Sequence, residues 1–599
     1  MKKLSTFLLI AGLTLSGFSQ NLPGSRDYRT YCNPIDIDYT YVAHNSYTGV
    51  SYRAGADPAV INFKGKYFMF VTRSYGYWMS TDMSNWEFIT PQGWYFNGSN
   101  APAAAVHGDK VIVAGDPSGR MAVIHTDTPE NGDWKTSYSV LPIAIQDPAL
   151  FVDDDGKVYL YEESSNVHPI YGVELDPENN YLPKGEPKAL ISLNPEKHGW
   201  ERFGQDHSSE MKPFLEGPWM TKHKGKYYLQ YGAPGTEFNV YADGVYTGDH
   251  PLGPFEYAPY NPISYKPGGY VTGAGHGSTV QDNNDKYWHF ATMPIAVNYK
   301  FERRIGLFPA GFEEDGQMYV NTAYGDYPHF LPDTEVEDHK ERFSGWMLLS
   351  YGKKATASSV VNDTVRQQVI GPQMTAITRE NDKGYGPANL VDEQISTFWV
   401  ANGNDESMQA TVDLGAVMQV KAIQVNFQEF NAAVFGRAPG LKHQFKIESS
   451  TDGEEWTVLV DYSQNDRDQP HAYIELEKET DARYLRYRNF DTPNEYLALS
   501  GFRIFGNGYG KAPATPENIQ IDRNVDRRDA SIKWDPVDDA MGYVIYWGIE
   551  ENKLNNSVMM YDRSNYELRA LSTEQAYYFE IEAFNENGVG QRSEPIRVN

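Results

Sequence analysis

One pattern recurs five times between residues 57 and 325 of this 599-residue chain, and it constrains the fold more than any other feature. Each copy has a short apolar run, a tight turn that contains a lysine, and a second run rich in aliphatic or aromatic residues. The copies begin near residues 57, 101, 147, 216 and 276. A strand, a turn and a second strand explain each copy. Repeats of roughly 40–70 residues with about four strands each are typical of propeller blades, so we expect a five-bladed β-propeller.

A string of unrelated hairpins in a β-sandwich is the alternative to a propeller. The recurrence of one register in all five copies favours the propeller. The composition agrees with an all-β fold, because Phe, Trp and Tyr make up 14% of the chain and long helical periods are scarce.

Four of the five copies carry an ionisable residue at the start of the first strand. In a propeller the innermost strand of every blade lines the central channel, so equivalent strand starts meet at one end of the axis. The register holds, in chain order, Asp57, Ala101, Asp147, Glu216 and His276. Three carboxylates and an imidazole would then converge from distant parts of the sequence. Such a cluster repels itself unless a ligand, proton or cation compensates, and proteins keep such clusters for function more often than for stability.

The chain is strongly acidic, with a formal net charge of -28 and a pI near 4.9. This charge argues against a nucleic-acid or anionic-membrane partner. A neutral ligand fits better, and aromatic-rich surfaces suit sugars because the C–H faces of sugars stack on rings. We therefore expect an oligo- or polysaccharide partner.

The first 20 residues have the pattern of a cleavable export signal. Two lysines precede an apolar run over residues 7–15, and small and polar residues follow. The apolar run is too short to span a bilayer, and no later segment is long enough. We therefore expect a periplasmic or secreted protein without membrane insertion. Cys32 is the only cysteine, so no internal disulfide can form.

The composition changes after the repeats, and period-2 alternation there predicts two further β domains. The predicted organisation is a signal peptide at 1–20, the propeller at 21–330, a linker at 331–350, a β-sandwich at 351–508, a linker at 509–516 and a second β-sandwich at 517–599.

The motifs at the repeat starts resemble those of glycoside hydrolase family 43, a family of five-bladed β-propellers. The likeness covers about residues 28–325. Residues 351–508 resemble a discoidin (coagulation factor 5/8 C-terminal-type) domain, which is a common carbohydrate-binding module. Residues 517–599 resemble a fibronectin type III domain. The matching motifs of the propeller are Asp57-Pro58, Gln146-Asp147-Pro148, Glu216-Gly217-Pro218, Gly275-His276-Gly277 and the first-blade signature at 80–86; those of the last domain are Trp534 and Tyr577.

The resemblance implies a role for each residue of the register. Asp57 matches the general base that activates water, and Glu216 matches the general acid that protonates the leaving oxygen. Asp147 matches the carboxylate that raises the pKa of the acid and orients it. His276 matches a channel histidine that holds a calcium ion or water in many members. Arg303 matches an arginine that contacts the substrate, although its arginine neighbour leaves that register open by one.

Other residues near these motifs have two interpretations each. Trp78 and Trp219 are candidate substrate-binding platforms, as is Trp94, but packing in the aromatic core is an equal alternative. His276 between two glycines is either a ligand of a channel metal or water, or a packed structural residue. Residues 241–259 look like an insertion in blade four near the pocket, which would affect substrate specificity.

The expected function is that of an exported, exo-acting, inverting glycosidase. The expected substrates are α-L-arabinofuranosides or β-D-xylosides of plant-type polysaccharides, with β-galactosides or galactofuranosides as further options. Inversion needs one protonated and one ionised carboxyl with a water between them, and a third carboxylate can keep the proton on the acid. The chemistry requires no cofactor, and a structural calcium is the only cofactor considered. The alternative is a non-catalytic glycan-binding propeller, and the sequence gives no indication of an oligomeric state.

Overall fold

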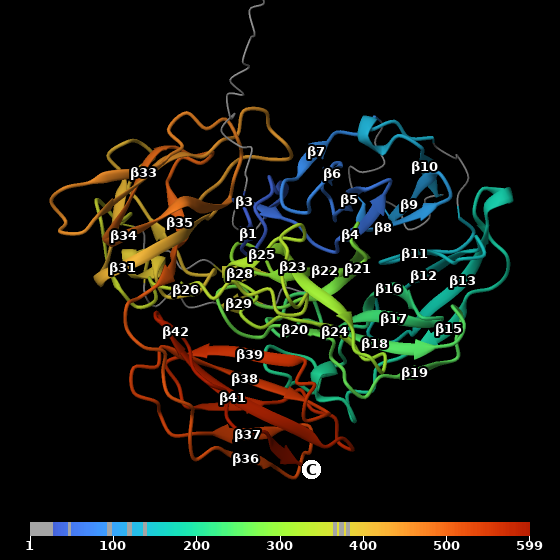
Figure 1. Cartoon of the computed structure of the whole chain (residues 1–599). Helices are drawn as coiled ribbons and strands as arrows, with labels where there is room; N and C mark the ends of the chain where they lie inside the picture. Colours follow the sequence, from blue (N-terminus) through green and yellow to red (C-terminus); the bar gives the residue numbers. More distant parts are fainter. Residues whose placement is uncertain are drawn as a thin grey trace, which may run out of the picture.

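The computed structural model describes residues 28–45, 50–92, 99–116, 123–135, 141–362, 368–370, 376–378 and 384–599. The described residues form β-strands, joined by turns and four short 3-10 helices. Three β domains pack against one another, with the propeller in blue to green, the discoidin-like domain in orange and the fibronectin-like domain in red (Figure 1). The predicted signal peptide and Trp94 lie outside the described residues. No helix within the described part of the chain is long and apolar enough to cross a membrane.

Five antiparallel sheets form the propeller, and each sheet follows the chain outward from the channel. Blade one contains β4 (Ala59–Phe63), β5 (Lys66–Phe70), β6 (Tyr77–Ser80) and β7 (Glu87–Ile89); blade two β8 (Asn100–His107), β9 (Lys110–Asp116) and β10 (Ile124–Thr126); blade three β11 (Ala149–Val152), β12 (Val158–Glu162), β13 (Ile170–Asp176), β14 (Leu182–Pro183) and β15 (Lys188–Ile191); blade four β16 (Glu216–His223), β17 (Lys226–Ala233), β18 (Ala242–Gly248), β19 (Phe255–Tyr257) and β20 (Ser264–Tyr265); blade five β21 (Gly275–Gln281), β22 (Tyr287–Pro294), β23 (Arg303–Phe312) and β24 (Met318–Val320).

The inner strands β4, β8, β11, β16 and β21 lie side by side in this order, and β21 contacts β4 to close the ring. Before blade one, β2 (Thr40–Asn45) and β3 (Val50–Ala54) form a hairpin. The strand β1 (Thr30–Tyr31) pairs with β25 (His329–Phe330), which follows blade five in the chain. The prediction of an all-β chain with a five-bladed propeller is confirmed.

The discoidin-like domain is a sandwich built on one eight-stranded sheet, in the order β26-β35-β31-β34-β32-β33 with β27 on β31 and β30 on β35. Register shifts divide the pairing of its two longest strands, β31 and β34. The strands are β26 (Met347–Leu348), β27 (Lys354–Ala357), β30 (Trp399–Val400), β31 (Gln409–Phe427), β32 (Gln444–Ser450), β33 (Thr457–Asp461), β34 (His471–Asp491) and β35 (Ala498–Asn507), with a separate hairpin of β28 (Gln368–Ile370) and β29 (Ala376–Thr378).

The fibronectin-like domain is a two-sheet sandwich, with β36-β37-β40 in one sheet and β39-β38-β41-β42 plus β43 in the other. Trp534 lies edge-on against Tyr543 in its core, and the Tyr577 hydroxyl accepts a hydrogen bond from the Ser572 backbone N–H at 3.0 Å. This corner bond is the one expected for the domain type. The strands are β36 (Gln520–Arg523), β37 (Ala530–Lys533), β38 (Gly542–Gly548), β39 (Asn556–Tyr561), β40 (Asn565–Leu568), β41 (Tyr577–Asn585), β42 (Gly588–Val589) and β43 (Ile596–Val598).

Two segments differ from their sequence-based interpretation. Residues 241–259 are not an insertion, because they supply β18 and β19, the third and fourth strands of blade four. Residues 331–350, which composition marked as a linker, are packed in place: Met347 and Leu348 are fully buried in β26, and this strand pairs with β35 of the discoidin-like domain.

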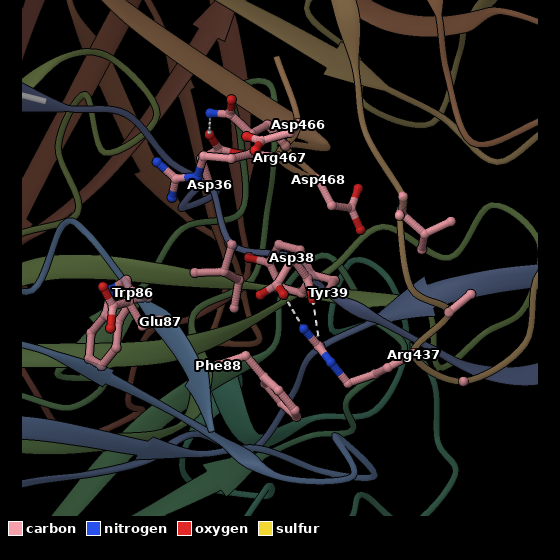
Figure 2. Close-up of a pocket in the computed structure, with 16 residues that line it drawn as sticks. Asp36, Asp38, Tyr39, Trp86, Glu87, Phe88, Arg437, Asp466, Arg467 and Asp468 are labelled. Carbon is pink, nitrogen blue, oxygen red and sulfur yellow. Dashed lines mark hydrogen bonds and ion pairs between the residues drawn. The ribbon is translucent and has the colours of Figure 1, made fainter. Parts of the chain in front are cut away.

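The domains share cores as well as surfaces. One apolar cluster joins Trp200, which lies between blades three and four, and Tyr231 of blade four to Trp534 and Ile581 of the fibronectin-like domain. The contact between the propeller and the discoidin-like domain is instead rich in charge. Figure 2 shows one groove of this contact, where Arg437 reaches across to Asp38 and covers the ring of Phe88.

Candidate active site

The inner strands begin with an unusual backbone conformation in every blade. A positive φ costs energy for residues other than glycine, and such strain persists mainly where function over-determines the conformation. Since the strained residue has the same place in each blade, the bend directs equivalent side chains toward one end of the channel. The residues at this position are Asp57 (φ 57°), Ala101 (φ 40°), Asp147 (φ 43°), Gly217 (φ 60°) and His276 (φ 40°).

Glu216 therefore stands one residue before the register in which the sequence pattern placed it. Gly217 occupies the equivalent position of blade four, and a β-bulge follows in the pairing of β16 with β17. A Cβ atom at Gly217 would lie 2.4 Å from Cγ of His276, so only glycine leaves room for the imidazole there. The inner strands of blades two and five have the same register shift, so blade four differs only in carrying its acid one residue earlier.

His276 joins the acids of two other blades. Its Nδ1 atom lies 3.3 Å from Oδ1 of Asp57 and 3.7 Å from Oδ2 of Asp147. Burial lowers the pKa of His276. The negative charges of Asp57, Asp147 and Glu216 raise it by more than burial lowers it, so the net pKa is above the usual value. The imidazole therefore favours its cationic form and partly neutralises the acids.

Asp57 is held in its ionised form. Burial raises its pKa, but the charges of Arg303 and His276 and a hydrogen bond from Thr72 outweigh burial, and the net pKa is below the usual value. The Thr72 hydroxyl donates to Oδ2 at 2.5 Å and accepts the Ala101 backbone N–H at 2.8 Å, while Arg303 NH1 lies 3.3 Å from Oδ1. Blade two, which has no acid in the register, thus helps to hold the acid of blade one.

Glu216 is biased toward the protonated form. Burial raises its pKa, and neither the charge of His276 nor the hydrogen bond from Tyr241 reverses that shift. The Tyr241 hydroxyl donates to Oε1 at 2.6 Å, and the Ser164 hydroxyl donates to Oε2 at 3.0 Å. These two donors fix the orientation of the carboxyl. No sequence signal marked Ser164, and Tyr241 was noted only at the edge of the supposed insertion.

Asp147 also retains its proton to unusually high pH. Burial is the main cause and His276 opposes it, while the charges of Glu216 and Asp57 add to it and bring the pKa to about 7. One site therefore contains a carboxyl with a lowered pKa and two with raised pKa values. Carboxyls whose environments push their pKa values apart are the mark of an acid–base pair.

Arg303 completes the site, and its neighbour does not. Arg303 NH1 donates to Thr236 Oγ1 at 3.0 Å as well as facing Asp57, whereas its buried Nε atom has no hydrogen-bond partner among the described residues. That N–H is a donor for a substrate hydroxyl or for water. Arg304 points away from the acids and pairs with Glu429 of the discoidin-like domain at 3.2 Å. Of the two arginines, Arg303 is therefore the one that lies at the acids of the channel.

The two candidate tryptophan platforms have other places. Trp78 is fully buried in the core of blade one, and its Nε1 donates to Asp38 at 2.6 Å, so it is a core residue and does not face the acids. Trp219 donates to the Thr279 carbonyl at 3.1 Å and packs against the apolar cluster of blades one and two. Since Trp219 belongs to blade four, its ring reaches across the channel to blades one and two.

A second buried pair, missed in the sequence, lies behind His276. Asp243 of β18 accepts the Gly277 backbone N–H at 2.9 Å, and its Oδ2 atom lies 3.3 Å from Nε2 of His289. Its charge is one of those that raise the pKa of His276. Asp243 thus supports both the backbone and the charge of the channel histidine.

The residues around His276 do not fit a calcium ion. Calcium takes about six to eight oxygen ligands, whereas the Nδ1 atom of His276 faces Asp57 and Asp147 as a hydrogen-bonding partner. Within the described part of the chain, no group of three or more His, Cys, Asp or Glu side chains is arranged to hold a metal ion. No chemical step proposed below passes through a metal.

Known proteins resemble parts of this chain. A Beta-xylosidase of Xylanibacter ruminicola is 31% identical over 169 residues, which cover 24% of this chain and 46% of that protein. A Xylosidase/arabinosidase of Bacteroides ovatus is 31% identical over 152 residues, which cover 22% of this chain and 42% of that protein. The chain thus spans less than half the length of these curated relatives. A solved Glycoside hydrolase structure aligns with a TM-score of 0.44 and 20% identity over 78% of this chain and 99% of that chain.

Three family models match the chain in succession. Residues 50–318 match glycosyl hydrolases family 43, residues 373–500 match the F5/8 type C domain, and residues 514–599 match the fibronectin type III domain. The order agrees with the resemblance found in the sequence and with the three β domains of the structure. The chain therefore carries a glycosyl hydrolases family 43 domain, an F5/8 type C domain and a fibronectin type III domain, in that order.

Proposed function

We propose that this protein hydrolyses glycosidic bonds with inversion at the anomeric carbon. The observation that carries the proposal is the division among three buried carboxyls of one pocket: the pKa of Asp57 is lowered, and those of Glu216 and Asp147 are raised. Glycosidases of either stereochemistry need an ionised carboxylate and a protonated acid. We propose inversion because Asp57 and Glu216 come from blades one and four, whose inner strands are not neighbours in the ring, and an inverting pair must leave room for a water between its carboxyls.

The proposed reaction is a single displacement. Asp57 takes a proton from a water molecule as the water oxygen attacks the anomeric carbon. The bond between that carbon and the leaving oxygen breaks, and Glu216 gives its proton to the leaving oxygen. The proton balance closes because Asp57 ends protonated and Glu216 ends ionised, and exchange with solvent restores both.

The other residues of the site orient and stabilise this pair. Tyr241 and Ser164 hold the Glu216 carboxyl, and burial together with the negative charge of Asp57 disfavours its ionised form. His276 and Arg303 compensate the charge of Asp57, and the unpaired Nε–H of Arg303 is available to a sugar hydroxyl.

We further propose exo action on α-L-arabinofuranosides or β-D-xylosides. The Trp219 ring that crosses the channel favours a blind pocket, which suits a terminal sugar. The names of the two bacterial relatives favour these two sugars over β-galactosides and galactofuranosides. The signal-like pattern at residues 1–20 supports export to the periplasm or the medium, where plant-type polysaccharides are accessible.

A panel of nitrophenyl glycosides tests the proposal, followed by proton NMR of the first-formed sugar. We expect turnover of the α-L-arabinofuranoside or the β-D-xyloside and a product whose anomeric configuration is opposite to that of the substrate. A retained anomer would make Asp57 a nucleophile and contradict inversion. Absence of all turnover, together with measurable glycan binding, would favour the non-catalytic alternative.

A further inference from the structure

A cavity of about 580 Å³ lies where the three domains meet. Its volume is in the range of sites that hold small ligands. All three domains contribute polar side chains to its wall. They include Gln205 and Asn239 from the propeller, Gln394 from the discoidin-like domain, and Arg563, Asn565 and Tyr566 from the fibronectin-like domain.

One loop forms a wall of both this cavity and the active site. Residues 235–241 carry Thr236, which accepts a hydrogen bond from Arg303, and Tyr241, which donates one to Glu216. Asn239 of the same loop lines the junction cavity. Because Asn239 and Tyr241 are two residues apart, their Cα atoms are within about 7 Å of each other. The cavity therefore neighbours the catalytic acid on the far side of a short loop.

The lining of the cavity suits a neutral, hydroxyl-rich ligand. The Oδ1 atom of Asn239 is buried and has no hydrogen-bond partner among the described residues, so it is an acceptor that a ligand can satisfy. Charges at the wall compensate one another, as in the pair of Asp206 with Arg569 at 2.7 Å. The half-buried ring of Tyr566 offers a surface for the C–H face of a sugar.

The groove of Figure 2 provides a contrast. It has a volume of about 440 Å³ between blade one and the discoidin-like domain. Charged groups at this groove form ion pairs across the two domains: Arg437 pairs with Asp38, and Arg53 pairs with Asp468. The guanidinium of Arg437 also covers the Phe88 ring at 3.3 Å. In that groove these charged groups already have partners, whereas the junction cavity retains an unpaired acceptor.

We propose that the junction cavity is a second glycan-binding site, which holds a neutral oligosaccharide segment of the polysaccharide whose terminal sugar enters the funnel. The choice of ligand rests on the proposed function. The fibronectin-like domain then contributes to substrate binding through Asn565 and Tyr566, in addition to its packing on blade four.

Calorimetric titration of the Glu216→Gln variant with xylohexaose and with arabinohexaose tests this site without hydrolysis. In that background we expect Tyr566→Ala to weaken binding of one of these oligosaccharides roughly three- to tenfold. Asn565→Ala, at an exposed position, should weaken the same ligand without affecting folding. Tyr509→Ala removes an exposed tyrosine that is not part of the cavity lining and should leave binding unchanged.

The same substitutions in the active enzyme separate this proposal from the proposed function. Tyr566→Ala should raise the KM for the oligosaccharide and leave nitrophenyl glycoside turnover unchanged. Binding that depends on Tyr566 in a protein that hydrolyses nothing would support the cavity and contradict the glycosidase. Unchanged binding of both oligosaccharides in Tyr566→Ala and Asn565→Ala, or an equal loss in Tyr509→Ala, would overturn the cavity. If Tyr566→Ala does not fold, Asn565→Ala decides.

Discussion

Arg303 and Arg304 are adjacent on β23, and both are buried, yet they belong to two different kinds of charged cluster. Arg303 faces the acids of the channel and keeps one N–H without a partner among the described residues. Arg304 faces the discoidin-like domain, where it bonds Glu429, the His471 ring and the Arg53 carbonyl. Alternation of side chains along a strand sends the two guanidinium groups to opposite faces.

The cluster around Arg304 joins two domains, and we call it the docking cluster: Arg53, Glu302, Arg304, Glu429 and Asp468. Its charges alternate in sign, as Arg53 contacts both Asp468 at 2.7 Å and Glu429 at 3.2 Å. Glu302 accepts bonds from the Asn298 backbone and from Gln428. The channel also combines three carboxyls with two cationic side chains, but it strains its backbone and leaves one N–H donor without a partner among the described residues. The two clusters thus differ in backbone geometry and in unused hydrogen-bonding capacity, and not in their count of charges.

Removal of residues 351–599 is the strongest test of that difference. It would strip Glu429 and Asp468 from Arg53 and Arg304 and would expose the apolar surface of blade four that packs on the fibronectin-like domain. We expect the isolated propeller to be insoluble or unfolded, because the apolar surface of blade four that packs on the fibronectin-like domain becomes exposed to water. Circular dichroism and nitrophenyl glycoside turnover of the fragment provide the measurement. A soluble, active propeller would show that the docking cluster is dispensable.

Glu216→Gln should abolish most activity while leaving the fold intact. Glutamine keeps the acceptor for Tyr241 but cannot donate a proton to the leaving oxygen. We expect a loss of roughly 10²–10⁴-fold on substrates with poor leaving groups and a smaller loss on activated aryl glycosides, which need less protonation. Kinetics with both substrate types measure this difference, and equal losses on both would contradict the acid role.

Arg304→Ala should show the opposite behaviour to Glu216→Gln. It leaves the carboxylate of Glu429 buried without this partner, which costs about 3–5 kcal/mol of unfolding free energy. The kcat on small glycosides at temperatures below unfolding should change little. Denaturant unfolding measures the loss, and Arg304→Met combined with Glu429→Leu is the control that should recover part of it. Wild-type stability with reduced kcat would place Arg304 in the active site instead.

Much of this comparison was present in the sequence, because a propeller repeats its register. The repeat predicted that Asp57, Asp147 and His276 meet, although far apart in the chain. The one-residue offset of Glu216 can be read in the motifs, because a proline directly follows Asp57 and Asp147, whereas Gly217 stands between Glu216 and its proline. The core position of Trp78 could not be predicted, because the local sequence around a tryptophan is the same whether its ring packs in the core of a blade or binds a ligand.

The docking cluster could not be predicted from local patterns at all. Arg304 and Glu429 are 125 residues apart, and nothing in the sequence of either segment identifies its partner. Tyr241 and Ser164 were missed for the same reason: their role exists only because the fold brings them to Glu216. Repetition reveals sites that obey a symmetry, whereas contacts between domains require the three-dimensional arrangement.

The smallest expected effect separates two carboxyls with the same pKa of about 7, Asp147 in the channel and Glu302 in the docking cluster. Burial is the main cause for both.

The pKa of an unfolded glutamate is about 4.3, so the folded state binds the Glu302 proton more tightly. The stability due to this proton is therefore fully present below about pH 4.3 and is lost as the pH rises through about 7. The Glu302→Gln variant mimics the protonated form. Between pH 5 and 7.5 its unfolding free energy should fall by about 1–3 kcal/mol less than that of the wild type. Its pH profile of kcat should be unchanged. Asp147→Asn should instead change the kcat profile near pH 7, because it removes the group beside Glu216 and Asp57 that titrates there. Denaturant unfolding and steady-state kinetics over the same pH range measure both effects. If Glu302→Gln moved the kcat profile, or Asp147→Asn left it unchanged, the two clusters would not be functionally separate.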